Sequence, residues 1–176
     1  MSDIAYELLF QHKNPSWLYS IDNGATTIWE RWNSYMRNEG MGPKGMNSFN
    51  HYAYGAIGDW LYRWAAGLQE AAPGFRKIRI KPHLNDHFTS MKAAQQTPYG
   101  PASSGWTLDG DALTLTVEIP ANTTAEVCVP SAAAAAVTES GRALDGRSDL
   151  EVAGWSDGYT LVRLGSGRYE FRSALK

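Results

Sequence analysis

The chain contains very little cysteine and no long apolar run. Only one of its 176 residues is a cysteine, Cys128, which excludes an intramolecular disulfide framework. Charged residues interrupt every apolar stretch before it reaches the roughly 20 residues of a membrane-spanning helix. The four histidines are scattered and do not form a zinc-binding pattern with the single thiol. We therefore expect no membrane partner, no metal and no cofactor.

An excess of charge of either sign is also missing. Lys and Arg number 16 and Asp and Glu number 18, so the formal net charge is −2. The two signs are interleaved along the chain, whereas a nucleic-acid-binding surface requires a basic excess. We expect no nucleic-acid partner. The first residues lack the basic segment of a signal peptide, which predicts a cytoplasmic location.

The spacing of apolar residues changes near Pro73. Before this point apolar residues recur at steps of three and four, most clearly over 49–68, which predicts a long amphipathic helix there. Shorter helices are predicted over 3–10 and 27–36. The segment 40–46 contains too much Gly and Pro for a helix and is predicted to be a loop.

After Pro73 apolar and polar residues alternate, as they do in strands with one buried face. Strands are predicted at 76–81, 113–119, 125–130, 159–163 and 169–172. Short strands at such turn-punctuated spacing are typical of an antiparallel β-sandwich. The alanine-rich segment 131–137 fits either a helical turn or a strand. The predicted class is therefore α+β, with helices in residues 1–72 and a sandwich in residues 73–176.

The helical part carries more aromatic surface than it can bury by itself. Five of the seven tryptophans lie in the first 70 residues, namely Trp17, Trp29, Trp32, Trp60 and Trp64. Two or three helices cannot cover such a stripe against one another, so the helical part is predicted to belong to something larger. For the chain alone we expect a homodimer through these helices.

Glu30 is the first candidate for chemistry. The segment Thr27-Ile-Trp-Glu30 fits a capping box, in which the Thr27 hydroxyl accepts the Glu30 N–H group and the carboxylate reaches back. Alternatively, Glu30 is a carboxylate held between Trp29 and Trp32 in an aromatic pocket. Apolar walls raise a carboxyl pKa and aromatic faces suit sugar rings, so this interpretation favours glycosidase chemistry.

His51 is the second candidate, in Ser48-Phe-Asn-His51-Tyr. A histidine at such a position is commonly a structural residue that satisfies local hydrogen bonds. The alternative is that Asn50 and His51 form hydrogen bonds with sugar hydroxyl groups. No serine stands in a Gly-x-Ser-x-Gly turn, so a Ser-His-Asp triad is not supported.

Together, these motifs resemble the C-terminal part of the bacterial α-L-rhamnosidase family. The resemblance rests on Gly24-Ala-Thr-Thr-Ile-Trp-Glu-Arg-Trp32 and on the segment from Ser48 to Tyr62. Later segments agree in order: Pro73 to Pro82, Thr97-Pro-Tyr-Gly100 and Ile119 to Ala125 resemble the β-sandwich that follows the catalytic barrel.

The resemblance implies a fold and a mechanism. It places residues 1–72 in the last helices of an (α/α)6 toroid, and the substrate is a glycoside with a terminal α-L-rhamnosyl group. The family inverts configuration, with an acid and a base about 6.5–9.5 Å apart on opposite faces of the sugar. Glu30 matches the general base, His51 matches a rhamnose contact, and Trp29 and Trp32 match residues that wall the pocket.

One element of the family's site is expected to be missing. The family's general acid lies well upstream of these motifs, in a segment that this chain does not include. We therefore expect the chain alone to be an incomplete and inactive part of a rhamnosidase. The rival interpretation is a non-catalytic carbohydrate-binding or scaffold module that keeps part of a sugar site.

Overall fold

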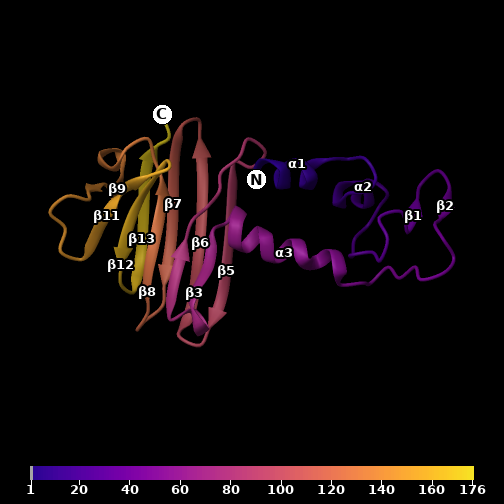
Figure 1. Cartoon of the computed structure of the whole chain (residues 1–176), viewed down its shortest axis with the longest axis horizontal. Coiled ribbons are helices and arrows are strands. Elements are labelled where there is room, and N and C mark those ends of the chain that lie inside the picture. Colours follow the sequence, from indigo (N-terminus) through magenta and orange to yellow (C-terminus); the bar gives the residue numbers. More distant parts are fainter. Residues whose placement is uncertain (1) are drawn as a thin grey trace. The chain divides into compact units, whose positions relative to one another are not determined.

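The computed structural model describes residues 2–176 (Figure 1). Contacts divide the chain into two compact units, one ending at Asp59 and the other running from Trp60 to Lys176. The change in apolar spacing predicts a domain boundary at residue 72. In the structure, the strand Leu68–Ala72 pairs with the strand Lys77–Ile80 within the second unit.

The first unit consists of short elements joined by loops. They are α1 (Ser2–Phe10), α2 (Trp17–Asp22), β1 (Tyr35–Met36), β2 (Gly40–Met41), the 3-10 turn η1 (Ala53–Ala56) and the start of α3 (Ile57–Trp60). The side chain of Ser16 accepts a hydrogen bond from the Tyr19 N–H group and so caps α2. The helix predicted over 3–10 is confirmed by α1. The loop predicted over 40–46 is confirmed for residues 42–46, whereas Gly40 and Met41 form the short strand β2.

The helix predicted over 27–36 is wrong. These residues form bends and turns and end in β1, which pairs with β2 in an antiparallel hairpin. The local pattern was misleading because Thr27 and Glu30 bond to residues 18 or more positions away, in the segment 48–49. Hydrogen bonds to Ser48 and Phe49 therefore replace the local bonds that a helix over 27–36 would require.

The helix predicted over 49–68 is correct in its middle and wrong at both ends. Helical turns run through η1, α3 and the π-helical segment η2 (Leu61–Ala65). Figure 1 draws this region as a coil labelled α3. The helix ends before Gly67, whose φ is +78° and where an added Cβ would lie 2.2 Å from the Pro82 nitrogen. Only glycine fits where the chain turns into the first strand of the sandwich.

Two sheets make up the second unit. Its strands are β3 (Leu68–Ala72), β4 (Lys77–Ile80), β5 (Ser90–Thr97), β6 (Gly100–Asp109), β7 (Ala112–Ile119), β8 (Thr124–Pro130), β9 (Thr138–Glu139), β10 (Arg142–Ala143), β11 (Leu150–Ser156), β12 (Tyr159–Leu164) and β13 (Gly167–Ala174). The six-stranded sheet has the order β10-β9-β13-β7-β6-β5, and the five-stranded sheet has the order β11-β12-β8-β4-β3. All pairs are antiparallel except β4 with β8. The predicted α+β class with a sandwich is confirmed.

The core of the sandwich is built from the alternating faces of its strands. In β7, Leu113, Leu115, Val117 and Ile119 are buried, as the alternation predicts. The indole N–H group of Trp106 donates to the Ala65 carbonyl oxygen over 2.8 Å, and the Ser104 hydroxyl donates to the next carbonyl over 2.6 Å. These two buried polar groups are therefore paired with the segment that leads into β3.

All five predicted strands are present, and several others were missed. The alanine-rich segment left open in the sequence forms a 3-10 turn, η4 (Ala134–Ala136). The longest missed strands, β5 and β6, contain mainly small and polar residues. Their residues pair in continuous register from Ser90 with Thr107 to Thr97 with Gly100, so the pairing partner and not the local sequence defines them.

Candidate functional site

Hydrogen bonds join the two motifs singled out in the sequence. The His51 N–H group donates to the Ile28 carbonyl oxygen over 2.9 Å, and the Glu30 N–H group donates to the Ser48 carbonyl oxygen over 2.8 Å. The Thr27 hydroxyl donates to the Phe49 carbonyl oxygen over 2.5 Å. We call residues 27–30 and 48–51 the paired loops. Both candidate residues, Glu30 and His51, are therefore carried on one backbone framework.

The carboxylate of Glu30 is held by a backbone donor. The Ser48 N–H group donates to Glu30 Oε2 over 2.7 Å, so Glu30 and Ser48 bond to each other through both main chain and side chain. The side chain of Glu30 is half-buried. The capping-box interpretation is wrong, because Thr27 and Glu30 each bond to the opposite loop. A charge-assisted bond of this kind fixes the orientation of the carboxylate.

His51 is fixed by its own neighbours. Its Nδ1 atom accepts a hydrogen bond from the Ala53 N–H group over 3.3 Å, which favours the neutral tautomer with its proton on Nε2. The imidazole ring stacks on the Tyr52 ring, with centroids 5.4 Å apart and planes 5° apart. Nε2 is therefore the atom through which His51 can donate a hydrogen bond to a ligand.

Trp29 and Trp32 lie in aromatic packing within the first unit. Trp29 is 6% exposed and meets Phe49 edge to face, with centroids 5.3 Å apart. Trp32 stacks on Tyr54 at 3.7 Å and meets Trp17 edge to face at 5.1 Å. These contacts support the backbone on either side of Glu30. Their role as pocket walls stays a prediction.

Two hollows lie beside Trp29. The larger, of about 530 Å³, is lined by Asn23, Gly24, Thr26, Thr27, Trp29, Tyr35, Arg37 and Phe49. The smaller, of about 60 Å³, lies among the aromatic rings of Trp17, Trp29, Trp32 and Tyr54. Glu30 and His51 line neither hollow.

The segment that connects the two motifs also bonds to residues 31–34, which no sequence pattern indicates. The Arg31 side chain donates from Nε to the Met46 carbonyl oxygen over 3.0 Å. The Asn47 amide donates to the Ser34 carbonyl oxygen over 3.1 Å, and the Gly42 N–H group donates to the same oxygen over 2.9 Å. No local pattern marks these bonds, since each joins residues separated by a loop.

Within residues 2–176, no group of three or more His, Cys, Asp or Glu side chains is arranged to hold a metal ion. No helix in the same range has the length and apolar character needed to cross a membrane.

The first unit holds a carboxylate between two paired loops, and a β-sandwich follows it in the chain. Family models identify the class of protein to which this arrangement belongs. Residues 1–65 match the bacterial alpha-L-rhamnosidase 6 hairpin glycosidase domain, and residues 67–144 match the bacterial alpha-L-rhamnosidase C-terminal domain. The chain belongs to the bacterial α-L-rhamnosidase family. Residues beyond 144 add β11, β12 and β13 to the same two sheets.

Curated relatives show the same relationship. The chain is 50% identical to an alpha-L-rhamnosidase of Formosa agariphila over 129 residues, which are 73% of this chain and 14% of that protein. It is 44% identical to an alpha-L-rhamnosidase of Streptomyces avermitilis over 130 residues, 74% of this chain and 13% of that protein. The matched region is therefore about one seventh of the length of these relatives.

Solved structures agree with this assignment. The crystal structure of Streptomyces avermitilis alpha-L-rhamnosidase complexed with L-rhamnose superposes with a TM-score of 0.87 at 37% identity, covering 97% of this chain and 16% of that one. The alfa-L-rhamnosidase of Aspergillus terreus gives a TM-score of 0.79 at 36% identity, covering 98% of this chain and 17% of that one. The predicted resemblance to the C-terminal region of these enzymes is confirmed.

Proposed function

We propose that the chain supplies the general base and one sugar contact to the active site of an inverting α-L-rhamnosidase. The observation that carries the proposal is the pairing of Ile28 with His51 and of Glu30 with Ser48. This pairing places the two candidate residues on adjoining backbone segments of a six-hairpin glycosidase domain. Support also comes from the Streptomyces avermitilis relative, whose structure was determined in complex with L-rhamnose.

In this mechanism Glu30 removes a proton from water. Oε2 is occupied by the Ser48 N–H group, and Oε1 has no hydrogen-bond partner among residues 2–176, so it can accept the water proton. The water oxygen forms a bond to the anomeric carbon as the glycosidic bond breaks. The leaving oxygen takes a proton from a separate acid, which we place outside this chain. The released sugar has inverted configuration.

His51 holds the sugar in the proposed site. With Nδ1 engaged by Ala53, the Nε2–H group donates a hydrogen bond to a rhamnose hydroxyl oxygen. Trp29 and Trp32 act through packing that fixes the loop around Glu30. Positioning of this kind is what makes a single base effective.

Because an inverting displacement needs both an acid and a base, we expect the chain alone to leave aryl α-L-rhamnosides intact. The experiment that tests the proposal compares Glu30→Gln with the unchanged sequence in a chain carrying the complete six-hairpin domain. Removal of a positioned general base lowers turnover by about 10²–10⁴-fold. Glu118→Gln, in a surface ion pair of the sandwich, is the control and should leave turnover unchanged. Equal turnover in all three proteins would contradict the proposal.

A non-catalytic carbohydrate-binding module is the second candidate. The hollow of about 530 Å³ favours it, because its lining includes Asn23, Thr27 and Arg37 as well as Trp29 but does not include Glu30. In this case Glu30→Gln would leave rhamnose binding by the chain unchanged, and Arg37→Met would weaken it.

Association is a further part of the proposal. Large apolar side chains exposed in the first unit are Ile4, Leu8, Ile21, Ile28, Met41, Met46 and Tyr52. Exposed apolar groups of this number favour a contact that removes them from water, and a symmetric dimer is the commonest form. Light scattering at micromolar concentration should show a dimer of the isolated chain, and a monomer would contradict this expectation.

A further inference from the structure

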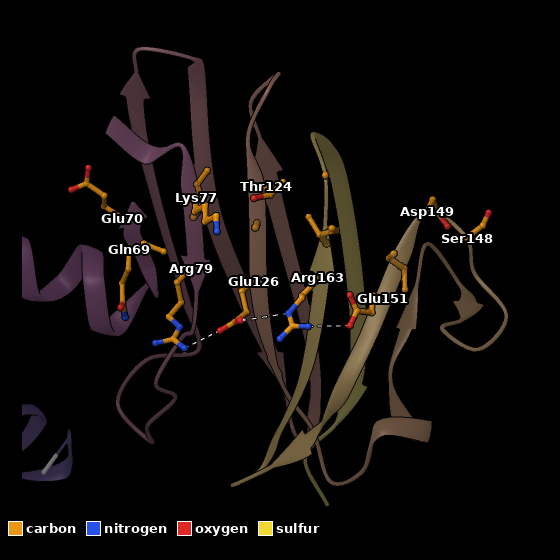
Figure 2. A pocket seen from close by; sticks show the side chains of 16 residues that line it. Gln69, Glu70, Lys77, Arg79, Thr124, Glu126, Ser148, Asp149, Glu151 and Arg163 are labelled. Carbon is orange, nitrogen blue, oxygen red and sulfur yellow. Dashed lines mark hydrogen bonds and ion pairs between the residues drawn. The ribbon is translucent and has the colours of Figure 1, made fainter. Parts of the chain in front are cut away.

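A hollow lies on the outer face of the five-stranded sheet. It measures about 830 Å³ and receives residues from β3, β4, β8, β11 and β12 and from the loop at Ser148 and Asp149. Figure 2 shows the polar side chains Gln69, Arg79, Glu126, Arg163 and Glu151 extending from these strands. It lies wholly within the second unit, so it does not involve Glu30 or His51.

One polar residue from each strand forms a continuous row across the sheet. The strand registers pair Glu151 with Arg163, Arg163 with Glu126, Glu126 with Arg79, and Arg79 with Gln69. Strands lie about 4.8 Å apart, so four steps span about 19 Å. We call these five side chains the polar row.

The charged side chains of the polar row alternate in sign, and neighbouring ones form ion pairs. Arg163 Nη1 lies 3.0 Å from Glu151 Oε1, Arg163 Nε lies 3.9 Å from Glu126 Oε2, and Arg79 Nη2 lies 2.8 Å from Glu126 Oε1 (Figure 2). Exposed ion pairs of this kind add little to the stability of a fold. The row therefore calls for an explanation other than holding the sheet together.

We propose that the polar row is a binding site for a neutral oligosaccharide, separate from the candidate active site. Two arginines balance two glutamates, so the row attracts neither a free anion nor a free cation. Each guanidinium carries five N–H donors and each carboxylate several lone pairs, more than the contacts within the row engage. Sugar hydroxyl groups both donate and accept, so one neutral ligand can bond to both kinds of group.

The lining also argues against other ligands. The larger apolar residues of its lining, Ile78, Leu150 and Leu164, belong to the buried core. A protein partner would need an apolar centre for its interface. Glu70 and Asp149 add negative charge and Lys77 adds positive charge at the margin, which gives a polyanion no net attraction. Recognition by hydrogen bonds alone predicts weak binding that changes little with salt.

The test is an NMR titration of the full chain, labelled with ¹⁵N, with the neutral disaccharide α-L-rhamnosyl-(1→6)-D-glucose. We expect saturable shifts at the amides of 77–79, 124–126 and 163–165. Arg79→Met should weaken this binding about tenfold, the effect of losing hydrogen bonds to one charged group. Arg168→Met, which breaks an exposed cross-strand pair of 2.9 Å on the other sheet, is the matched control and should have no effect.

Other results would overturn the proposal: no saturable shift in the row, equal weakening by both arginine variants, or tighter and salt-sensitive binding of a digalacturonate probe. If Arg79→Met lowers the melting temperature, Glu126→Gln keeps the shape of the row and should produce the same loss. Glu30→Gln should leave these shifts unchanged, so failure of the catalytic proposal and failure of this one are distinguishable.

Discussion

The two units of the chain differ in how many apolar side chains they bury. The sandwich encloses a core that includes Trp106, Leu115, Val127, Val162 and Phe171, all of them no more than 1% exposed. Up to Asp59, the buried apolar side chains among the described residues are Tyr6 and Trp29. The first unit is held instead by hydrogen bonds between loops and by stacked rings. It carries the candidate catalytic residues, whereas the second unit carries the extended apolar core.

Truncation of core side chains should show this difference most strongly. Leu115 is fully buried in β7, and Leu115→Ala should lower the free energy of unfolding by about 2–5 kcal/mol. The matched change in the first unit, Leu8→Ala, alters a side chain that is 47% exposed and should have a small effect. Urea unfolding measures both values. Equal losses of unfolding free energy would contradict the inference that burial stabilises the second unit more than the first.

Ligand binding should instead be affected by substitutions in the first unit. His51→Ala removes the Nε2–H donor and should weaken L-rhamnose binding, in a chain with the complete six-hairpin domain, by about 1–3 kcal/mol. Calorimetric titration measures the affinity, and thermal unfolding serves as the control. A variant that binds rhamnose normally but unfolds at a lower temperature would show that His51 is a structural residue.

The smallest effect is expected at a charged cluster of the sandwich, formed by Glu139, Arg147 and Asp149. Arg147 contacts Glu139 over 3.0 Å and Asp149 over 2.5 Å, and its hydrogen bond lowers the pKa of Asp149 to about 2. A lowered folded-state pKa stabilises the protein above the unfolded pKa of about 3.9 and loses this contribution as the pH falls towards 2. The melting temperature of Asp149→Asn should therefore lie slightly below that of the unchanged chain near neutral pH. The difference should shrink as the pH falls from about 4 towards 2 and vanish below that pH, and a constant difference would contradict the assignment.

The sandwich was the more predictable unit because the alternation of apolar and polar residues in its strands is visible in the local sequence. Alternation in Leu113 to Ile119 reports directly on a strand with one buried face. The strands β5 and β6 escaped prediction because their small and polar residues carry no such pattern and are defined by their mutual pairing. The strands β9 and β10 are only two residues long, too short for any period to be visible.

The candidate site was predictable in its residues and unpredictable in its geometry. Glu30 and His51 were identified from a family resemblance, and the family is now confirmed, while their roles stay predictions. The bonds of Thr27 and Glu30 to residues 48–49 could not be predicted, because they close a loop and have no local signal. The same bonds explain why the helix predicted over 27–36 does not form.

The central claim is that the paired loops hold Glu30 as a general base. The most direct measurement is the turnover of an aryl α-L-rhamnoside by Glu30→Ala, in a chain with the complete six-hairpin domain, with and without azide. Azide needs no deprotonation and can attack the anomeric carbon directly in place of water. The account predicts a loss of about 10²–10⁴-fold without azide and recovery with azide, which yields the rhamnosyl azide of inverted configuration. Undiminished turnover without azide would contradict the account.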